Sequence, residues 1–236
     1  MGRFPLRGGM SSRVGKRGGK GVVVPWWKRA VDLGLLVSLA PVVLVVGLLI
    51  GCWIRAVSPG EVLFCQQRLG RGGKPFTMYK FRSMHVGAQT ECHERHVRKL
   101  ARSNRPLRKL DALGDPRLIV GGGVLRRSGL DELPQLINVL RGEMSLIGPR
   151  PCLPCEECFY NLCSCRRFDL LPGITGLWQV ERDERTTFCE MLEMDERYVR
   201  ELSIALDLRI LVRTPVALLG QIRPARDAVR QMKSHS

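Results

Sequence analysis

The chain has 236 residues, with 38 lysines and arginines against 22 acidic residues, which gives a formal net charge of +16. A surplus of this size indicates an anionic partner, such as nucleic acid, anionic lipid head groups or a phosphorylated substrate. The length suffices for an ordinary domain with a core, and the nine cysteines are an odd number. With no cleavable signal in view, these features exclude a small disulfide-stapled scaffold, and we expect reduced thiols facing a cytosol-like compartment.

The N-terminal segment is basic and rich in glycine. Residues 1–30 contain eight basic residues and no acidic residue. We therefore expect residues 1–25 to form a disordered basic arm. The stretch "VVVPWWKR" then places Trp26 and Trp27 beside Lys28 and Arg29, a combination typical of the membrane interface.

An uncharged run of 22 residues follows, from Leu33 to Ile54. About 20 such residues are enough to cross a bilayer. A signal peptide fits badly, because the run is too long and no small-residue cleavage site follows it. A soluble core helix is an alternative, but the length and the aromatic and basic flanks favour a membrane helix over residues 26–56.

The charges on both sides of this run predict that the helix re-enters the face from which it came. Eight basic residues precede the run, and the segment from Arg55 to Arg82 carries six against the single acid Glu61. Because basic flanks stay in the cytoplasm, a straight helix would leave one cluster outside. Pro41 supplies a bend, and Ser38 could satisfy a freed carbonyl group. A plain spanning helix is the alternative.

The next segment predicts a β-hairpin with a glycine-rich turn. Leu63–Gln66 and Phe76–Phe81 have strand character, and the turn "GRGGK" covers Gly70–Lys74.

Two groups of residues have spacings that could hold a metal ion. The first is "CHERH" (Cys92, His93, His96), within the polar, loosely helical stretch Val86–Leu110. The second is the run of cysteines at positions 152, 155, 158, 163 and 165. We favour a solvated helix for the first and structural or incidental cysteines for the second, because zinc ribbons usually show two well-separated pairs.

The stretch Leu133–Arg141 predicts an amphipathic helix whose start carries two carboxylates. Its apolar residues follow the helical spacing (Leu133, Leu136, Ile137 and Leu140), and Gly142 ends it. Pro134 is tolerated only in a first turn, so the helix must begin close to Asp131. Ser128 is a possible N-cap, and acids in a first turn complement the helix dipole, which is the ordinary interpretation of Asp131 and Glu132.

The start of a helix is also a natural binding place for phosphate, because it offers free N–H groups and the positive end of the dipole. The two carboxylates alone would repel a phosphate. A divalent cation or nearby arginines must then intervene. Mg²⁺ commonly uses one or two carboxylates together with phosphate oxygens, and Arg126, Arg127 and Arg150 can supply guanidinium groups.

The remaining segments are two rigid loops and an apolar stretch. The loops are "GPRP" (Gly148–Pro151) and "LPGITGLWQV" (Leu171–Val180). The stretch Tyr198–Gly220 is apolar but carries several charges, which favours helices that lie along the interface or pack on the domain over a second span. Residues 223–236 form a basic tail.

Together these residues resemble the bacterial sugar transferase family, the monotopic phosphoglycosyl transferases that act on polyprenol phosphate. The matching pieces are "KRAVDLGLLVSLAP", "QQRLGRGGKPFTMYKFRSM", "DPRLIVGGGVLRRSGLDELPQLINVLRGEMSLIGPRP", "LPGITGLWQV" and "MDERYV…LDLRILVRT". They occur in family order across roughly residues 26 to 222.

The resemblance implies a fold and a reaction. The fold is α/β, mostly α, with a re-entrant membrane helix and a small cytoplasmic catalytic domain (residues 57–222) that has interfacial amphipathic helices. The reaction transfers a sugar phosphate from a UDP-sugar to undecaprenyl phosphate and releases UMP, at the cytoplasmic face of the bacterial inner membrane. Membrane lipids are partners, nucleic acid is not, and a homo-oligomer is compatible with the sequence.

The resemblance also assigns roles to residues. Asp131 attacks the β-phosphorus and forms an aspartyl-phosphosugar, and Glu132 holds Mg²⁺. Arg126 and Arg150 match positions that engage phosphate or nucleotide. "PGITG", with Gly173 and Thr175, would line the nucleotide side. Lys80 and Asp195 match further polar positions near the site.

The chain departs from the family pattern at several positions outside the pair of carboxylates Asp131 and Glu132, here called the dyad. Ala40-Pro41 replaces the usual Ser-Pro, Leu171 replaces a basic residue, and Glu181, Arg182 and Asp183 replace Ser-Gly-Arg, which puts nucleotide or sugar contacts of that loop in doubt. A membrane-anchored, non-catalytic scaffold is therefore one rival interpretation. A nucleic-acid binder is a second, although no recognition motif supports it.

Overall fold

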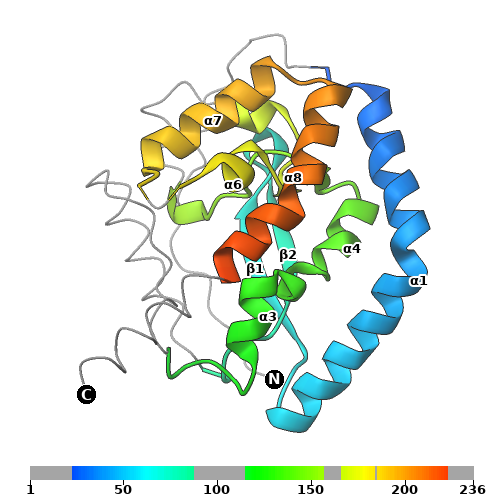
Figure 1. The fold of residues 1–236 in the computed structure, drawn as a ribbon, viewed down its shortest axis with the longest axis vertical. Helices are drawn as coiled ribbons and strands as arrows, with labels where there is room; N and C mark the ends of the chain where they lie inside the picture. Colours follow the sequence, from blue (N-terminus) through cyan, green and yellow to red (C-terminus); the bar gives the residue numbers. More distant parts are fainter. Residues whose placement is uncertain (1–22, 88–114, 157–165, 184, 223–236) are drawn as a thin grey trace.

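The chain folds around one long N-terminal helix and two small β-sheets (Figure 1), in a computed structural model that describes residues 23–87, 115–156, 166–183 and 185–222. The helices and strands are α1 (Trp26–Val57), β1 (Leu63–Leu69), η1 (Arg71–Gly73), β2 (Pro75–Phe81), α3 (Gly122–Ser128), η3 (Leu130–Glu132), α4 (Gln135–Leu140), β3 (Ser145–Ile147), η4 (Pro154–Glu156), η5 (Arg166–Asp169), β4 (Gly173–Thr175), α6 (Leu177–Glu181), α7 (Phe188–Arg200) and α8 (Ile204–Ile222). The architecture is thus mostly helical, as predicted. The basic tail, nearly all of the basic arm and the "CHERH" group lie outside the described residues.

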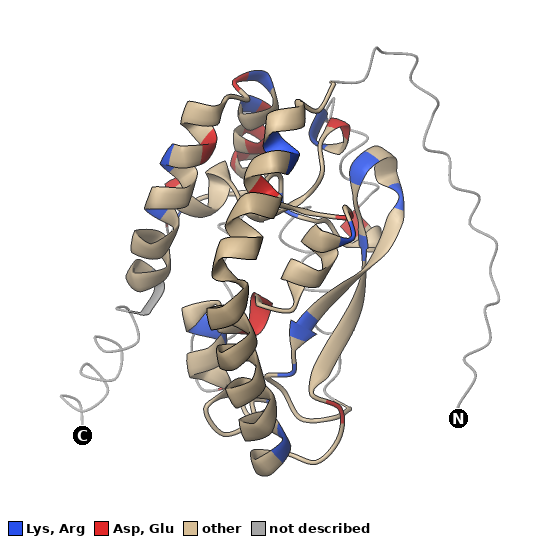
Figure 2. Cartoon of the chain, turned by 90° about the vertical axis from the view of Figure 1, so that its right-hand side faces the viewer, with Lys and Arg blue, Asp and Glu red and all other residues tan. Residues whose placement is uncertain are grey.

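The helix α1 is the apolar helix that the sequence predicts. It is continuous from Trp26 to Val57, and its mean hydropathy of 2.8 and its length suit membrane association. Figure 2 faces this helix and shows no acidic or basic residue along its middle. Pro41 lies inside the helix, and Figure 1 shows that α1 is bowed, with its middle farther from the rest of the chain than either end. Ser38 donates to the Gly34 carbonyl (2.8 Å), so it does not serve the carbonyl group freed by Pro41.

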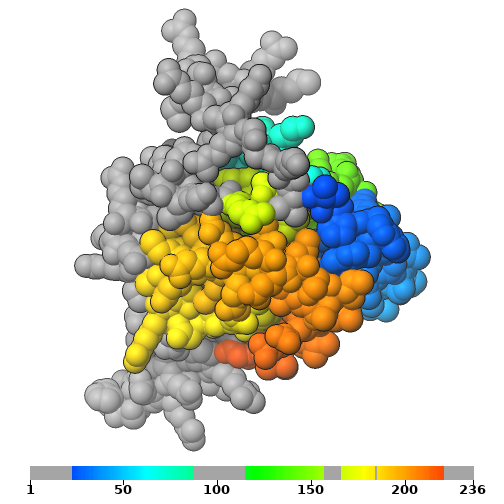
Figure 3. Space-filling view, turned by 90° about the horizontal axis from the view of Figure 1, so that it is seen from above, coloured from blue at the N-terminus to red at the C-terminus, as the bar shows by residue number. Residues whose placement is uncertain are grey.

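The N-terminal end of α1 is held on the domain by buried charges. Lys28 is 2% exposed, and its Nζ donates to Asp207 Oδ2 and to the Tyr198 hydroxyl, both at 2.8 Å. One turn later, Asp32 Oδ1 accepts a hydrogen bond from the Ser145 hydroxyl (3.0 Å). Figure 3 looks onto this end and shows the start of α1 against α8. Lys28 therefore turns inward to an ion pair and does not act as the interface cation that "WWKR" suggested.

The C-terminal end of α1 packs on the same domain. Ile54 is fully buried in a cluster with Phe81, Ile119 and Leu125. Both ends of the helix therefore contact one body, whereas the apolar side chains between them face outward. The exposed side chains of this middle part are Val37, Leu39, Val42, Leu44, Val45, Leu48 and Leu49.

The predicted β-hairpin is confirmed. Strands β1 and β2 pair antiparallel from Leu63 opposite Phe81 to Leu69 opposite Pro75. The glycines of the turn are required, because Gly72 has a φ of 67° that favours a residue without a Cβ.

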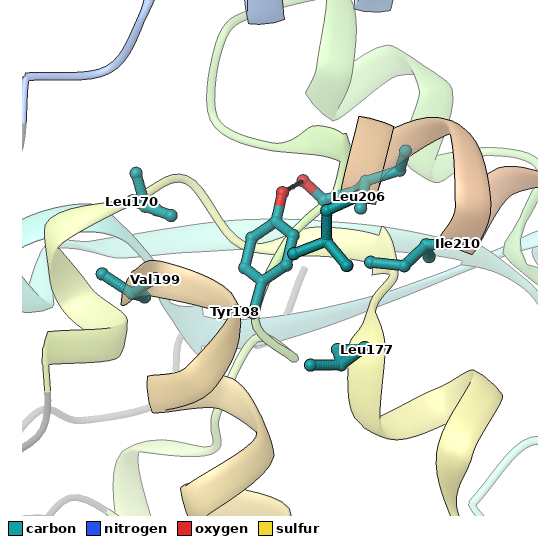
Figure 4. Close-up of a cluster of buried hydrophobic side chains, with 7 residues drawn as sticks. Leu170, Leu177, Tyr198, Val199, Leu206 and Ile210 are labelled. Atoms are coloured by element: carbon teal, nitrogen blue, oxygen red, sulfur yellow. Dashed lines mark hydrogen bonds between the residues drawn. The ribbon is translucent and has the colours of Figure 1, made fainter. Parts of the chain in front are cut away.

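A parallel pair of short strands, β3 and β4, forms the second sheet, with Ser145 opposite Gly173. Beside this sheet, Tyr198 of α7 is fully buried among apolar residues from α6, α7 and α8 (Figure 4). Its hydroxyl donates to Asp207 Oδ1 (2.7 Å). This core joins α7 and α8 to the sheet, because polar and apolar contacts converge on one tyrosine.

The helix predicted over Leu133–Arg141 is shorter, and it buries a different face. The α-helical part, α4, begins at Gln135, and its buried residues are Gln135, Asn138 and Val139. Ile137 and Leu140, which the periodicity placed in the core, are exposed. Asn138 takes the inward position because its amide bonds the edge of β2, donating to the Thr77 carbonyl at 2.8 Å.

Candidate active site

Asp131 and Glu132 lie in a separate short turn, η3, between α3 and α4. Gly129 ends α3 with a φ of 73°, and Pro134 stands where α4 begins, so the chain cannot run through as one helix. The expected N-cap role of Ser128 is wrong, because its hydroxyl donates backward to the Leu125 carbonyl (3.0 Å).

The peptide groups of this turn are partly used within it. The Glu132 N–H donates to the Gly129 carbonyl at 3.0 Å, and the Leu133 N–H donates to the Leu130 carbonyl at 3.3 Å. The dyad is therefore not the open first turn of a long helix that we expected. Side chains rather than a helix dipole must supply most of the positive charge at this place.

Lys80 supplies one such charge. Its Nζ, on β2, lies 2.7 Å from Glu132 Oε1. The Glu132 side chain is 34% exposed, whereas Asp131 is 8% exposed. The structure thus brings together three of the predicted site residues. Glu132 lies at the surface in an ion pair with Lys80, and Asp131 is more deeply buried.

Arg126 belongs to the same part of the fold. It lies in the last turn of α3, five positions before Asp131, and is half-buried. Hydrogen bonds from Arg117, whose Nη2 lies 2.6 Å from Asp115 Oδ2, lower the pKa of Asp115, and the charge of Arg126 adds to this effect. The helix that precedes the dyad therefore delivers positive charge to this region.

Arg150 and Asp195 are brought together in a second, more deeply buried cluster. Arg150 Nη1 lies 3.3 Å from Glu156 Oε1, and Arg167 Nη2 lies 3.0 Å from Asp195 Oδ2. Arg167 also donates to the Arg150 carbonyl. From β1, Arg68 Nη1 reaches the carbonyl of Pro151 at 3.2 Å. The "GPRP" loop is therefore fixed by charges on both sides, which orients Arg150.

The two carboxylates of this cluster differ in ionisation. Burial raises the pKa of Asp195 to about 6, against the opposing charges of Arg167 and Arg150. At Glu156, burial acts in the same direction, but the guanidinium groups of Arg150 and Arg68 outweigh it and lower the pKa. Glu156 is therefore an anion that anchors Arg150. Neither Glu156 nor Arg167 carries a sequence signal, since their partners are distant along the chain.

Gly173 and Thr175 hold loops together in the structure. The Gly173 N–H donates to the Pro149 carbonyl (2.8 Å), and a Cβ on Gly173 would lie 2.1 Å from the Gly148 nitrogen. Only glycine permits this approach of the two loops. The Thr175 hydroxyl pairs with that of Thr214 on α8 (2.9 Å). Their predicted contacts with the nucleotide stay a prediction.

The altered loop after "WQV" has internal partners. Glu181 forms an ion pair with Arg197. The Arg182 guanidinium lies over the Trp178 ring, 5.2 Å from its centroid. Burial and the nearby charge of Arg150 lower the pKa of Arg182. The altered loop therefore still places a guanidinium where it senses the charge of Arg150, although the family's Ser-Gly-Arg is absent.

The cysteine cluster is only partly described. Cys152 is buried, and burial raises the pKa of its thiol to about 12. Cys155 is half-buried and reduced, and the other three cysteines of the cluster lie outside the described residues. Within the part of the chain that the structure describes, no three His, Cys, Asp or Glu side chains converge on a metal site.

The comparisons with known proteins agree on one family. The model of the bacterial sugar transferase family matches residues 23–221. Galactosyl transferase CpsE of Streptococcus agalactiae is 41% identical over 186 residues, which are 75% of this chain and 40% of CpsE.

Two further relatives are covered over more of their length. Exopolysaccharide production protein ExoY of Sinorhizobium fredii is 35% identical, over 76% of this chain and 77% of ExoY. The UDP-glucose:undecaprenyl-phosphate glucose-1-phosphate transferase of Caulobacter vibrioides is 37% identical, over 84% of this chain and 72% of that enzyme. The chain thus spans two fifths of CpsE but about three quarters of these two. The family match covers the apolar helix, the dyad, Arg126 and Arg150. The chain therefore belongs to the bacterial sugar transferase family.

Proposed function

We propose that the protein transfers a sugar 1-phosphate from a UDP-sugar to undecaprenyl phosphate, yielding undecaprenyl-diphospho-sugar and UMP. Asp131 attacks the β-phosphorus of the donor, the bond from that phosphorus to the bridging oxygen breaks, and UMP leaves. A phosphate oxygen of the acceptor then attacks the aspartyl-phosphosugar and restores the Asp131 carboxylate. Two displacements replace one difficult displacement between two anions.

The observation that carries this proposal is the dyad itself. A half-buried turn holds two adjacent carboxylates, and Lys80 of β2 contacts one of them at 2.7 Å. Relatives are named as undecaprenyl-phosphate sugar phosphotransferases, for example in Salmonella typhimurium and Komagataeibacter xylinus. The activity assigned to those proteins matches the chemistry that a carboxylate nucleophile beside cations supports.

The donor set fits Mg²⁺ better than a softer metal. The dyad offers carboxylate oxygens, one of them on a side chain that is 34% exposed, and no cluster of three ligating side chains occurs among the described residues. Mg²⁺ commonly takes one or two carboxylates and fills its shell with water and phosphate oxygens. We therefore assign Glu132 as the ligand. Bound there, the ion would neutralise charge on the diphosphate.

Arginines complete the electrostatic part of the proposal. Arg126 approaches from α3, and Arg150 from the loop after β3, where Glu156 holds its guanidinium at 3.3 Å. Guanidinium groups match the geometry of phosphate oxygens. We assign both to the phosphates of the donor, with Lys80 near the reacting phosphoryl group. Gly173, Thr175 and Asp195 shape and support the nucleotide side.

We also propose that α1 is a re-entrant helix in the bacterial inner membrane, with the domain on the cytoplasmic face. Lys28 and Ile54, near opposite ends of α1, are both buried against the same domain. A spanning helix would carry one of its ends to the far face of the bilayer. The outward-facing apolar middle and Pro41 within it suit a helix that dips into the bilayer and returns.

Further apolar side chains support interfacial placement of α8. They recur along one side of the helix, at Ile204, Leu208, Val212, Val216 and Leu219, and are all exposed. Asp207 and Ile210 lie on the buried side. A helix with one exposed apolar face and basic residues such as Arg209 and Arg213 suits the plane of the head groups.

A screen for UMP release across a panel of UDP-sugars tests the function. Purified protein in phospholipid vesicles that contain undecaprenyl phosphate should release UMP from at least one donor, and a chelator of Mg²⁺ should abolish release. The scaffold interpretation is correct instead if no donor yields UMP while the protein binds the vesicles and is folded.

A further inference from the structure

The last turns of α1 pass the open end of the β1–β2 hairpin (Figure 1). A groove is lined by residues from both. Its volume is about 610 Å³, within the range of small-molecule sites. The helix contributes Gly47, Gly51 and Arg55, and the hairpin side contributes Val62 and Phe81. Among the described residues that line the groove, Arg55 alone is charged.

Two glycines create the space. Gly47 and Gly51 are four positions apart, so they lie on one face of α1. A Cβ on Gly47 would lie 3.8 Å from Phe81 Cζ, and one on Gly51 would lie 3.6 Å from Val62 Cγ1. Both distances are ordinary contacts, so a methyl group fits, but any longer side chain must enter the groove.

The groove is connected to the dyad through two chain segments. Phe81, its wall on β2, directly follows Lys80, whose Nζ contacts Glu132 at 2.7 Å. Leu133, which directly follows Glu132, packs on the cluster that contains Phe81. Two chain segments thus lead directly from the groove to the reacting groups.

We propose that this groove binds the isoprenoid chain of a polyprenyl monophosphate acceptor. The inference rests on the proposed function and adds the place of the acceptor tail. A single apolar chain that ends in a phosphate matches an apolar lining with one cation. The outward-facing apolar part of α1 continues from Gly47 into Val45 and Leu44, so the rest of the chain passes from the groove into lipid.

Photolabelling tests the groove independently of turnover. The full chain in phosphatidylcholine vesicles is irradiated with an isoprenyl monophosphate that carries a photoreactive group on its chain, and labelled peptides are mapped by mass spectrometry. Label is expected on residues 47–56 and 62–81, and undecaprenyl phosphate should displace it. Equal displacement by phosphatidic acid, or label spread evenly along α1, would overturn the proposal.

Matched variants add a second readout. Gly51→Leu should fill the groove and weaken labelling about tenfold, because several buried methylene groups lose their contacts. Gly51→Ala should weaken it less, which keeps the test open if the leucine variant misfolds. Gly34→Leu is the control, since it adds the same side chain to α1 at a position with nothing within 4 Å. Labelling of Gly51→Leu equal to that of Gly34→Leu would exclude the groove.

The kinetics separate this inference from the proposed function. If the protein transfers sugar phosphate, Gly51→Leu should raise KM for undecaprenyl phosphate but not for a short, water-soluble isoprenyl phosphate. A KM for undecaprenyl phosphate that Gly51→Leu leaves unchanged would count against the groove. Displaceable label on a protein that releases no UMP would support the groove while the proposed function fails.

Discussion

Asp131 and Glu132 are neighbours in the chain but meet different surroundings. Lys80 lies 2.7 Å from Glu132, so that carboxylate is paired with a cation at the surface of the turn. Asp131 is more deeply buried, so fewer waters need to be displaced before its oxygen meets a phosphorus atom. This difference in burial and pairing is our physical reason for proposing Asp131 as the nucleophile and Glu132 as the metal ligand.

Asp131→Asn is expected to lower the rate of UMP release by about a thousandfold or more, because an amide is not a nucleophile that can form the intermediate. Intact-mass measurement with a UDP-sugar donor should show a sugar-phosphate adduct on the wild type and none on the variant. Asp169→Asn, at a partly exposed carboxylate of η5, is the control and should keep both signals. An adduct on Asp131→Asn would show that another residue is the nucleophile.

Asp195 predicts a dependence of stability on pH. Burial raises its pKa from 3.8 to about 6. A carboxyl group whose pKa is raised by folding contributes most below its unfolded pKa, and that contribution is lost as pH rises through its folded pKa. Between pH 4 and pH 7 the loss should be roughly 3 kcal/mol, since one unit of pKa corresponds to about 1.4 kcal/mol.

Denaturant unfolding of wild type and Asp195→Asn across this range measures the effect. The free energy of unfolding of the wild type should fall relative to the variant as pH rises, because asparagine stays neutral throughout. Parallel curves for the two proteins would mean that Asp195 is ionised in the fold at all these pH values.

Among the helices and strands, the sequence predicted those whose formation depends on residues close together in the chain. The membrane helix predicted over residues 26–56 agrees with α1 to within one residue, and the glycine turn predicted the hairpin. The apolar spacing around Ile137 was misleading, because the inward face of α4 is set by Asn138 and its bonds to β2. A buried polar residue whose hydrogen-bond partner lies about sixty positions away produces no hydrophobic periodicity in the sequence.

The ion pair between Lys28 and Asp207 supplies a prediction at this scale. Lys28→Met should lower the free energy of unfolding by about 3–5 kcal/mol, because it leaves a buried carboxylate without its cation. The double variant Lys28→Met/Asp207→Leu should recover most of that loss, because both charges are then gone. The Tyr198 hydroxyl keeps a partner in the Ile147 carbonyl (3.3 Å).

Arg200→Met, at an exposed position of α7, is the control for this cycle and should change stability by about 0.5 kcal/mol or less. Thermal unfolding in detergent measures all four proteins. A double variant as unstable as Lys28→Met alone would show that the pair acts through packing rather than charge.

For the whole molecule, the family motifs located the dyad, but they did not reveal how the arginine loop is fixed. The "GPRP" motif made Arg150 a candidate site residue, and its role stays a prediction. The contacts of Glu156, Arg167 and Arg68 with this loop could not be predicted, because each meets the loop only after folding. The same limit applied to the two ends of α1. Charge placement predicted that both ends lie on one side. The buried ion pair at one end and the apolar cluster at the other, which attach α1 to the domain, could be seen only in the structure.

Topology is the prediction that belongs to the whole molecule. In a variant without native cysteines, single cysteines at Ser11 and Ser234 should both be protected from an impermeant thiol reagent added outside intact cells. Both ends of α1 would then be on the cytoplasmic side, as expected from their contacts with one domain. Labelling at Ser11 with protection at Ser234 would show a spanning helix.

Pro41→Ala is the companion variant. Restoring one backbone hydrogen bond should straighten α1 and move some molecules to the spanning form, which would appear as partial labelling at Ser11. Leu39→Ala changes a neighbouring exposed residue without adding an N–H donor, and it should leave the labelling pattern of the parent protein.

The pairing of Lys28 with Asp207 also bears on how the chain is made. The two residues are 179 positions apart, so a ribosome that adds about 5–20 residues per second needs roughly 10 to 40 seconds to reach the partner. During that interval Lys28 and Asp32, one helical turn apart, can neutralise each other. Chains stalled before Ile204 should therefore be bound to the membrane but sensitive to protease. Insertion of the N-terminal helix is then expected to precede its attachment, which waits for α8 to be translated.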